Sequence, residues 1–389
     1  MSDSPNVRFP SERKKAHLEY YLTREPVFLA VLFGVAVVCF GAVSGLSGMY
    51  HSQRNSLGTE WSARGAEDLQ QKRYDRAVVE FRTALVYSRD NYSYQLDLAE
   101  ALLGQKKTEE AAAYLVNLWD REPENGLVNL ELARISAQLG EADQALRYYH
   151  NAVYATWPGD RQEARQQARL ELIDYLLKIG DKQQAQSELI ALAANLDNDP
   201  ARQAHLGDLF VKAGDYSDAL AAYLLGLKTS RKDPLALEGA GHTAFQLGRY
   251  RQAHQYLQAA VAAGAHDPQV EDELKITQLV LRMDPFRSQI SASERDRDVI
   301  EAFDAAKERL DSCAAANPAS MPAAEQNLSE SWTKLKPQIN ARGLRQNSDL
   351  ALNAMELVFE IERQTSAPCG HPNPTDRALL LIARLHEGN

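Results

Sequence analysis

Two cysteines, Cys313 and Cys369, are the side chains whose placement in this sequence most clearly suggests chemistry. The third cysteine, Cys39, lies in an apolar run, so the other two permit one disulfide and exclude a disulfide-framework domain. We expect a bundle of helices over 285–389, in which Cys313 follows the first helix and Cys369 follows the third. In an up-down-up bundle the ends of the first and third helices lie on the same side. We therefore predict a Cys313–Cys369 disulfide, which needs an oxidising compartment and restrains the unfolded chain by a few kcal/mol.

Two other interpretations of this pair are open. Cys313 and Cys369 could be unrelated buried thiols. They could also bind a metal together with His371, although the sequence offers no obvious fourth ligand.

Catalytic motifs are absent from the sequence. It contains no G-x-S-x-G elbow, no P-loop, no H-E-x-x-H, no G-x-G-x-x-G before a helix and no C-x-x-C-H haem site. The nine histidines are scattered. We therefore expect no enzymatic activity, no cofactor, no bound metal and no small-molecule substrate. The 43 basic and 53 acidic residues give a net charge of −10, without a basic stripe, which argues against a nucleic-acid partner.

A membrane anchor is predicted near the N-terminus. No charged residue occurs between Pro26 and Tyr50, and Val27–Gly48 is dominated by apolar residues and glycine. This segment has the roughly 20 residues that a spanning helix needs, and it is too long for the apolar core of a signal peptide. We predict an uncleaved transmembrane helix at 26–50 after a leader at 1–25. Within the leader, 11–24 is expected to be either an amphipathic juxtamembrane helix or a disordered segment.

The basic residues around this span predict its orientation. Only Arg54 and Arg64 follow it closely. Five basic residues precede it, namely Arg8, Arg13, Lys14, Lys15 and Arg24. The positive-inside rule therefore places the N-terminus in the cytoplasm and the rest of the chain outside the membrane.

Small residues in the span provide candidate surfaces for helix packing. Gly41 and Gly45 form one G-x-x-x-G pair, and Ser44 and Gly48 form a similar pair of small residues. Such faces let a second membrane helix approach closely. The alternative is that glycine is simply common in membrane helices.

A constant spacing dominates the middle of the chain, and it corresponds to a repeat about 34 residues long. It separates alanines in two sets, which are Ala77, Ala111 and Ala145, then Ala185, Ala219 and Ala253. The step between the two sets is longer by six, and the excess falls in 156–167, where we expect a loop. Twelve positions before each alanine the residue is small in every case except one: Gly65, Ala99, Ala133, Ile173, Gly207 and Gly241. Four positions after each alanine it is large: Phe81, Leu115, Tyr149, Leu189, Tyr223 and Leu257.

This pattern resembles the tetratricopeptide repeat family over residues 57–268, in six registered copies. The resemblance implies an α-solenoid of about six helix pairs. A helix at 269–283 is expected to cap it, so that the solenoid domain is 57–284. The turns between paired helices are expected at Gly140, Gly180, Gly214 and Gly248, and Pro123, Pro200, Pro234 and Pro268 are expected to close repeats.

In this family the first helices of the pairs line a groove that binds peptides or folded partners. The matching positions in this sequence carry candidate groove residues: Glu100, Arg134, Asp174, Asp208, His242, Lys178 and Lys212. The Lys/Asn cluster by which chaperone-binding members grip a carboxylate is missing. The mixed charges suggest a partner with basic groups opposite Glu100, Asp174 and Asp208. The alternative is that these are solvated polar positions without a partner.

Beyond Pro285 the repeat pattern stops, and apolar residues recur at helical spacing. We predict a small helical bundle over 285–389, with breaks at 317–322, 342–347 and 367–374 and a last short helix from Thr375. The expected fold is therefore all-α: a transmembrane helix, a repeat solenoid and a terminal bundle.

The expected function is a non-enzymatic, membrane-anchored scaffold. It would bind the proteins of a bacterial inner-membrane complex through the groove, the terminal bundle and the membrane helix, with its repeats in the periplasm. The alternative is a chaperone or targeting receptor whose repeats face the cytosol. That alternative predicts free thiols at Cys313 and Cys369 and a carboxylate-binding cluster.

Overall fold

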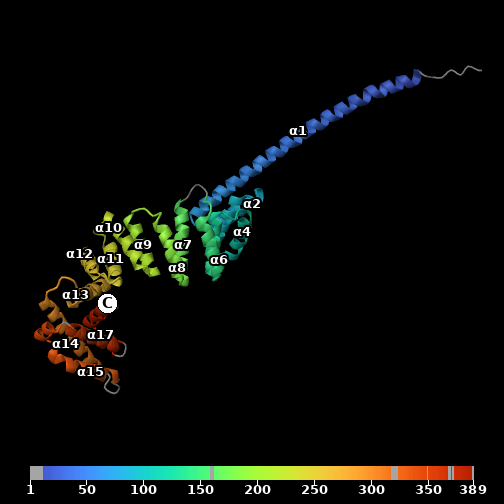
Figure 1. The fold of residues 1–389 in the computed structure, drawn as a ribbon. Coiled ribbons are helices and arrows are strands. Elements are labelled where there is room, and N and C mark those ends of the chain that lie inside the picture. Colours follow the sequence, from blue (N-terminus) through green and yellow to red (C-terminus); the bar gives the residue numbers. More distant parts are fainter. Residues whose placement is uncertain are drawn as a thin grey trace, which may run out of the picture. The chain divides into compact units, whose positions relative to one another are not determined.

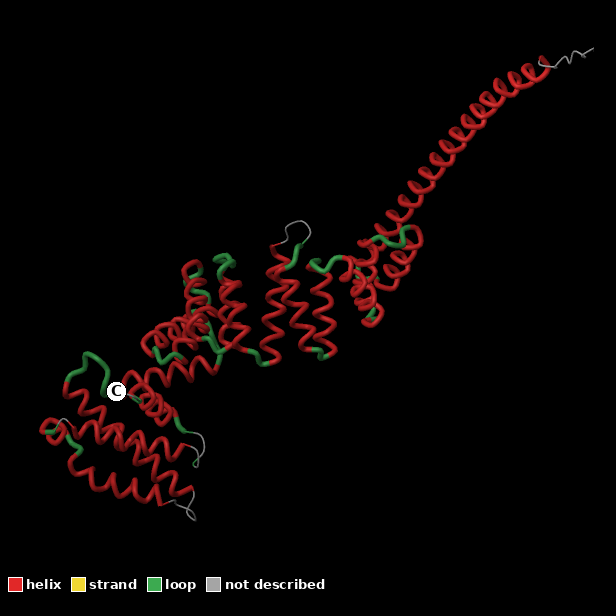
Figure 2. The backbone as a smooth tube through the Cα atoms, turned by 45° about the vertical axis from the view of Figure 1, so that its right-hand side comes forward, coloured by secondary structure: helices red, strands yellow, loops and turns green. Residues whose placement is uncertain are grey.

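The structure is a computed structural model that describes residues 12–157, 162–316, 323–347, 349–366, 369 and 372–387, with the backbone alone for 12–27, 316 and 323–325. Within these ranges the chain consists of helices and loops, and it contains no strand (Figure 2). A single parallel bridge joins Asn125 to Thr156. The all-α prediction is confirmed. The chain divides into two compact units, Met1–Ala168 and Arg169–Asn389.

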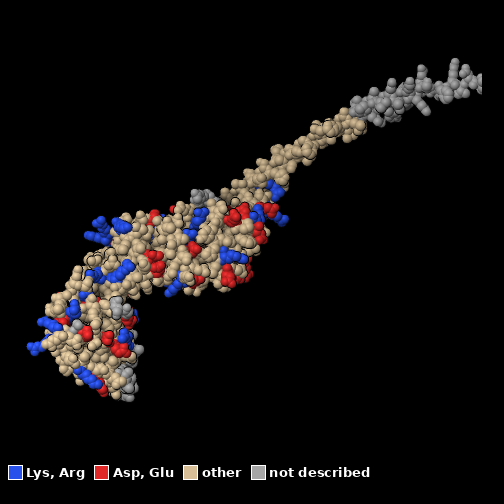
Figure 3. Space-filling model, in the orientation of Figure 1, with Lys and Arg blue, Asp and Glu red and all other residues tan. Residues whose placement is uncertain are grey.

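The first helix, α1 (Glu12–Gln70), is 59 residues long and contains the predicted span (Figure 1). It is the one helix among the described residues that is long and apolar enough to cross a membrane, with a mean hydropathy of 2.4 over 18 residues. Phe33, Phe40 and Met49 are 72%, 75% and 74% exposed. The visible surface of this part of α1 carries no charged side chain (Figure 3). Among the residues that the structure describes, nothing therefore packs on the apolar stretch.

The predicted span at 26–50 and the start of the first repeat lie on one continuous helix. No proline follows Tyr50 until the repeats are well under way, so α1 continues through Gly58 and Gly65 as the first helix of the first pair. The Arg54 guanidinium donates hydrogen bonds to the Val86 and Tyr87 carbonyl oxygens, at 3.2 and 2.8 Å. The candidate anchor and the first repeat thus share one helix. Of the predicted leader, 1–11 lies outside the described residues, and the backbone is helical from Glu12.

Antiparallel pairs follow in the predicted register. In the first unit the end of α1 pairs with α2, and the other helices are α2 (Tyr74–Tyr87), α3 (Tyr92–Gly104), α4 (Thr108–Arg121), α5 (Gly126–Leu139) and α6 (Ala142–Tyr154). The boundary between the two units falls within α7 (Gln162–Ile179). The further helices of the solenoid are α8 (Lys182–Ala193), α9 (Pro200–Ala213), α10 (Tyr216–Thr229), α11 (Pro234–Gln246) and α12 (Tyr250–Ala262). The six alanines that established the register are fully buried on the second helices.

The small residues on the first helices permit the close approach that the sequence predicts. A Cβ atom added to Gly207 would lie 2.7 Å from the Tyr223 ring, and one added to Gly241 would lie 2.7 Å from Leu257. The large residue of each second helix thus packs onto the bare backbone of its partner. The exception, Ile173, is fully buried in the core around Leu189 and Leu206.

The turn between paired helices requires one residue with a left-handed backbone conformation, that is, a positive φ. Gly140, Gly180, Gly214 and Gly248 have φ between 69° and 83°, as only glycine adopts without strain. In the first two repeats the corresponding turn position is occupied by Lys72 and Lys106, with φ of 57° and 63°. These two turns have no glycine signal in the sequence.

The prolines that we expected to close repeats instead open the next one. Pro200, Pro234 and Pro268 occupy the first turn of α9, α11 and α13 (Pro268–Met283). Each follows an aspartate N-cap whose side chain accepts a hydrogen bond from a backbone amide of that turn. A proline suits the first turn of a helix because a backbone N–H at this place has no hydrogen-bond acceptor within the helix, so its absence costs nothing. Pro123 precedes α5 by three residues.

The six extra residues between the two sets of repeats are only partly a loop. Trp157 is 6% exposed, covers Gly126 and donates a hydrogen bond to the Ala152 carbonyl oxygen, at 3.0 Å. Residues 158–161 lie outside the described ranges. Helix α7 has 18 residues where α9 has 14, so much of the excess lengthens a helix rather than a loop.

The terminal bundle shares its core with the capping helix. Helix α13 packs on α12 as expected, but its Ile276, Val280 and Met283 belong to the same buried cluster as Phe303 and Val358 of the bundle. The bundle consists of α14 (Ala292–Ala316), α15 (Ala323–Leu335), η1 (Lys336–Gln338), α16 (Ala341–Gln346), α17 (Asp349–Ser366) and α18 (Pro374–His386).

One predicted break in the bundle is wrong. The stretch 342–347 is mostly the short helix α16, which Asn340 caps by accepting from the Arg342 and Gly343 amides and which buries Leu344. The final helix α18 begins at Pro374, one residue before the expected start, because Asn373 and Asp376 form a capping box. The boundaries of the predicted domains, at 56/57 and 284/285, stay predictions.

Candidate functional site

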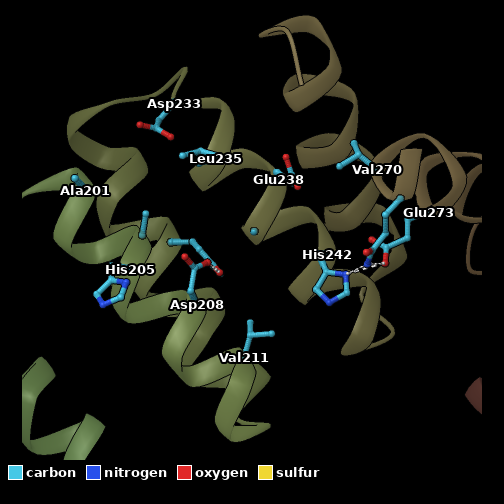
Figure 4. Close-up of a pocket in the computed structure, with 14 residues that line it drawn as sticks. Ala201, His205, Asp208, Val211, Asp233, Leu235, Glu238, His242, Val270 and Glu273 are labelled. Atoms are coloured by element: carbon cyan, nitrogen blue, oxygen red, sulfur yellow. Dashed lines mark hydrogen bonds and ion pairs between the residues drawn. The ribbon is translucent and has the colours of Figure 1, made fainter. Parts of the chain in front are cut away.

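A pocket of about 520 Å³ opens on the second unit, between the first helices α9 and α11 and the capping helix α13 (Figure 4). Two of the predicted groove residues, Asp208 and His242, line it. Four carboxylate side chains take part in the lining, those of Asp208, Asp233, Glu238 and Glu273. The structure therefore brings Asp208 and His242, which occupy equivalent positions of successive repeats, together with three acidic residues that the sequence analysis did not single out. These are Asp233, Glu238 and Glu273.

The end of the pocket on α13 is a hydrogen-bonded cluster. His242 Nδ1 lies 2.7 Å from Glu273 Oε1, and the Gln269 side-chain amide lies 3.0 Å from the same oxygen and 3.1 Å from His242 Nδ1. The Glu273 side chain is 6% exposed, and its Oε2 has no hydrogen-bond partner among the described residues. The cluster thus fixes one carboxylate oxygen and leaves the other unsatisfied.

The hydrogen bond that His242 donates to the Glu273 carboxylate raises the pKa of His242 above its usual value, against the opposing effect of burial. Protonated His242 would form an ion pair with Glu273. At higher pH a neutral His242 leaves the carboxylate uncompensated.

Across the pocket, the Tyr223 hydroxyl donates a 2.5 Å hydrogen bond to Asp208 Oδ1. Burial and this carboxylate raise the pKa of Tyr223. Burial, and then the neighbouring Asp267, raise the pKa of Glu238. These shifts reflect an excess of negative charge in a partly desolvated groove.

The other predicted groove residues of this unit lie outside the pocket. Asp174 and Lys178 on α7 and Lys212 on α9 are exposed and do not line the pocket. Their roles stay predictions.

In the first unit, the predicted residues Glu100 and Arg134 meet at a second acidic cluster. Arg134 forms an ion pair with Glu131, while burial, followed by the charges of Asp97 and Glu131, raises the pKa of Glu100 to about 7. Burial also raises the pKa of Asp97 to about 6. Two predicted positions are therefore in electrostatic contact here.

Several pocket residues were missed because they occupy repeat positions that the sequence analysis did not assign to the groove. Gln269 lies one repeat period after Leu235, and Glu273 lies one period after Gly239. The predicted groove positions were those of His242 and Lys212, whose next steps in the capping helix are the buried Ile276 and Val280, so the pocket uses two further positions of the repeat that were not counted as groove positions. His205, which also lines the pocket, precedes Gly239 by the same step.

The predicted cysteine pair is joined. Cys313 of α14 and Cys369 after α17 form a disulfide with 5.2 Å between their Cα atoms, which closes the predicted separation of 56 residues. Arg309 lies one turn before Cys313, and Thr365 lies one turn before Cys369. The Arg309 side chain donates a 2.8 Å hydrogen bond to the Thr365 carbonyl oxygen. In the disulfide neither cysteine carries a thiol, which differs from the interpretation as two unrelated buried thiols. His371 of the third interpretation lies outside the described residues.

The small residues of the candidate span face open space. A Cβ atom added to Gly41, Gly45 or Gly48 would meet no other atom of the chain within 4 Å, and Ser44 is exposed. Their role in helix packing stays a prediction.

Comparison with known families identifies the repeats. Two family models, each described as a tetratricopeptide repeat, match this chain, one over residues 102–156 and the other over 63–119 and 170–236. These ranges lie inside the predicted solenoid. The chain therefore contains tetratricopeptide repeats, a fold that typically serves as a non-enzymatic scaffold for protein–protein interactions.

Individual relatives are distant. Mouse superkiller complex protein 3 is 25% identical over 245 residues, which cover 58% of this chain and 15% of that protein. The match thus spans only a small part of that relative's length. Among solved structures, Pseudomonas aeruginosa PilF is 15% identical with a TM-score of 0.41, and the match covers 57% of this chain and 97% of that one. PilW, described as a widely conserved type IV pilus biogenesis factor, is 16% identical with a TM-score of 0.39. The match covers 55% of this chain and 97% of PilW.

Proposed function

We propose that this protein is a non-enzymatic scaffold anchored in a bacterial inner membrane by α1, which holds proteins of a membrane complex through the groove of its repeats. The observation that carries the proposal is the pocket at α9, α11 and α13. It lies where the first helices of successive repeats offer Asp208 and His242, and it combines apolar walls with a few fixed polar groups.

Three features support a periplasmic position for the repeats. Nothing among the described residues packs on the apolar part of α1, as expected of a helix surrounded by lipid, which supports the anchor that this position requires. Basic residues are concentrated on its N-terminal side. The Cys313–Cys369 disulfide belongs to an oxidising compartment.

The groove is tested by blocking it in the full-length protein. Ala201 is exposed and lines the pocket, whereas Ala221 is exposed on the second helix α10 and does not. We expect Ala201→Arg to reduce co-purification of partner proteins from solubilised native membranes at least fivefold, because it adds bulk and charge to the groove. Ala221→Arg, the matched control, should leave it unchanged. If both variants keep every partner, the groove is not the binding surface.

A further inference from the structure

We propose that the pocket at α9, α11 and α13 takes up a lysine or arginine side chain from an extended segment of the partner. This inference rests on the proposed function and specifies the partner chemistry at the same groove. It is argued from the charge of the lining, from one unsatisfied carboxylate oxygen and from the walls between them.

Apart from His242, which pairs with Glu273 when it is protonated, the charged groups of the lining are carboxylates. These carboxylates come from four positions on three helices and their caps, and none of the described residues that line the pocket is a lysine or an arginine. Figure 4 shows Asp208, Glu238 and Glu273 around a common space, with Glu273 beside His242. Carboxylates that converge in a partly desolvated pocket lower the energy of a cation there and repel an acidic segment.

The unsatisfied atom is Glu273 Oε2. A buried acceptor without a partner costs roughly 1–3 kcal/mol, and more if it is charged. The Gln269 amide and His242 hold the other oxygen in place, so Oε2 is already oriented before a ligand arrives. An ammonium or guanidinium group donates the hydrogen bond that this oxygen lacks, which gives the pocket a specific anchor rather than only a negative field.

The remaining walls suit the methylene stem of such a side chain. Ala204, Val211, Leu235 and Val270 line the pocket beside the carboxylates, and Leu235 is 72% exposed. Lysine and arginine bury their alkyl stems against apolar surface while their charged ends reach polar groups. Leucine at position 235 also offers apolar surface to the backbone of an extended peptide. An arginine has the further advantage that its planar fork can bond two carboxylates at once.

The test uses the full-length protein in lipid nanodiscs and fluorescein-labelled nonapeptide pools. The pools differ only in a fixed central residue, which is Arg, Lys, citrulline or Glu, and binding is followed by fluorescence anisotropy. Citrulline keeps the shape of arginine without its charge. We expect the Arg and Lys pools to bind at least tenfold more tightly than the citrulline pool, and the Glu pool to bind most weakly.

The variant Glu273→Gln should bring the Arg pool down to the affinity of the citrulline pool, whereas Asp143→Asn, at an exposed carboxylate of the second helix α6 outside the pocket, should leave the preference intact. If Glu273→Gln melts at a lower temperature than the parent, Asp208→Asn is used in its place. Equal affinity of the Arg and citrulline pools, or no binding of any pool, overturns the inference. Loss of partners from Ala201→Arg in native membranes would still support the groove in either case, so the two proposals fail separately.

Discussion

At the scale of single residues, the buried carboxyl of Glu362 in α17 has no hydrogen-bond partner for either oxygen among the described residues, although it is only 1% exposed. Burial, and then the charge of Asp376, raise the pKa of Glu362 to about 8, while Arg309 acts in the opposite direction. The folded state therefore holds a proton on Glu362 between about pH 4.5 and pH 8, where the unfolded state has lost it. Stability must fall as pH rises through this window.

We predict that Glu362→Gln, which mimics the protonated carboxyl at every pH, stabilises the protein increasingly from pH 6 to pH 8.5. The gain over this range should be about 1 kcal/mol or more, since one pKa unit corresponds to about 1.4 kcal/mol. The measurement is the melting temperature of the full chain in detergent against pH. Glu360→Gln is the control, because hydrogen bonds from Gln364 and Arg363 lower the pKa of Glu360. A difference between Glu362→Gln and the parent that is constant with pH would contradict the assignment.

The repeat register was sufficient to predict Asp208 and His242 as neighbours on the groove face. It did not predict that Glu273 completes their site, because Glu273 continues the repeat position of His205 and Gly239, which was not assigned to the groove. The pairing of His242 with Glu273, and the unsatisfied oxygen that results, depend on side-chain rotamers and burial. Neither follows from sequence spacing alone.

At the scale of elements, the turns of the first two repeats carry a conformational strain that the later ones avoid. A residue other than glycine costs roughly 1–2 kcal/mol in the left-handed region. Glycine itself costs about 0.5–1 kcal/mol in lost chain entropy on folding. Replacing Lys106, at φ 63°, should therefore give a net gain.

We predict that Lys106→Gly stabilises the protein by roughly 0.5–1 kcal/mol, measured as a higher melting temperature of the full chain. Lys107→Gly is the matched control, because Lys107 has an ordinary φ of −89° and should only lose stability on the same change. If Lys106→Gly melts below the parent protein, as the control should, the left-handed turn is not strained.

The sequence predicts helices well where burial is periodic and less well at their ends. The alanine column located every second helix because those positions are fully buried between helices. The unbroken α1 was not foreseen, since a span and a repeat were treated as separate segments although neither proline nor a glycine cap divides them. The short helix α16 was taken for a break because its cap and one buried leucine leave little periodic pattern.

At the scale of the whole molecule, the proposal requires both cysteines of the bundle to be outside the inner membrane and oxidised. We predict that a membrane-impermeant maleimide labels Cys313 and Cys369 in spheroplasts only after reduction. A Cys39→Ala background removes the exposed third thiol. Labelling that appears only after lysis, without any need for reductant, would place the repeats in the cytosol and favour the receptor alternative.

The central claim is that partners bind along the repeat groove, and site-specific photocrosslinking in native membranes tests it most directly. A photoreactive residue replaces either Leu235, which lines the pocket and is 72% exposed, or Ile190, which is 54% exposed on the second helix α8 and does not line it. We predict covalent adducts with another protein from position 235 and none from position 190. No adduct from position 235, or equal adducts from both positions, would contradict the claim.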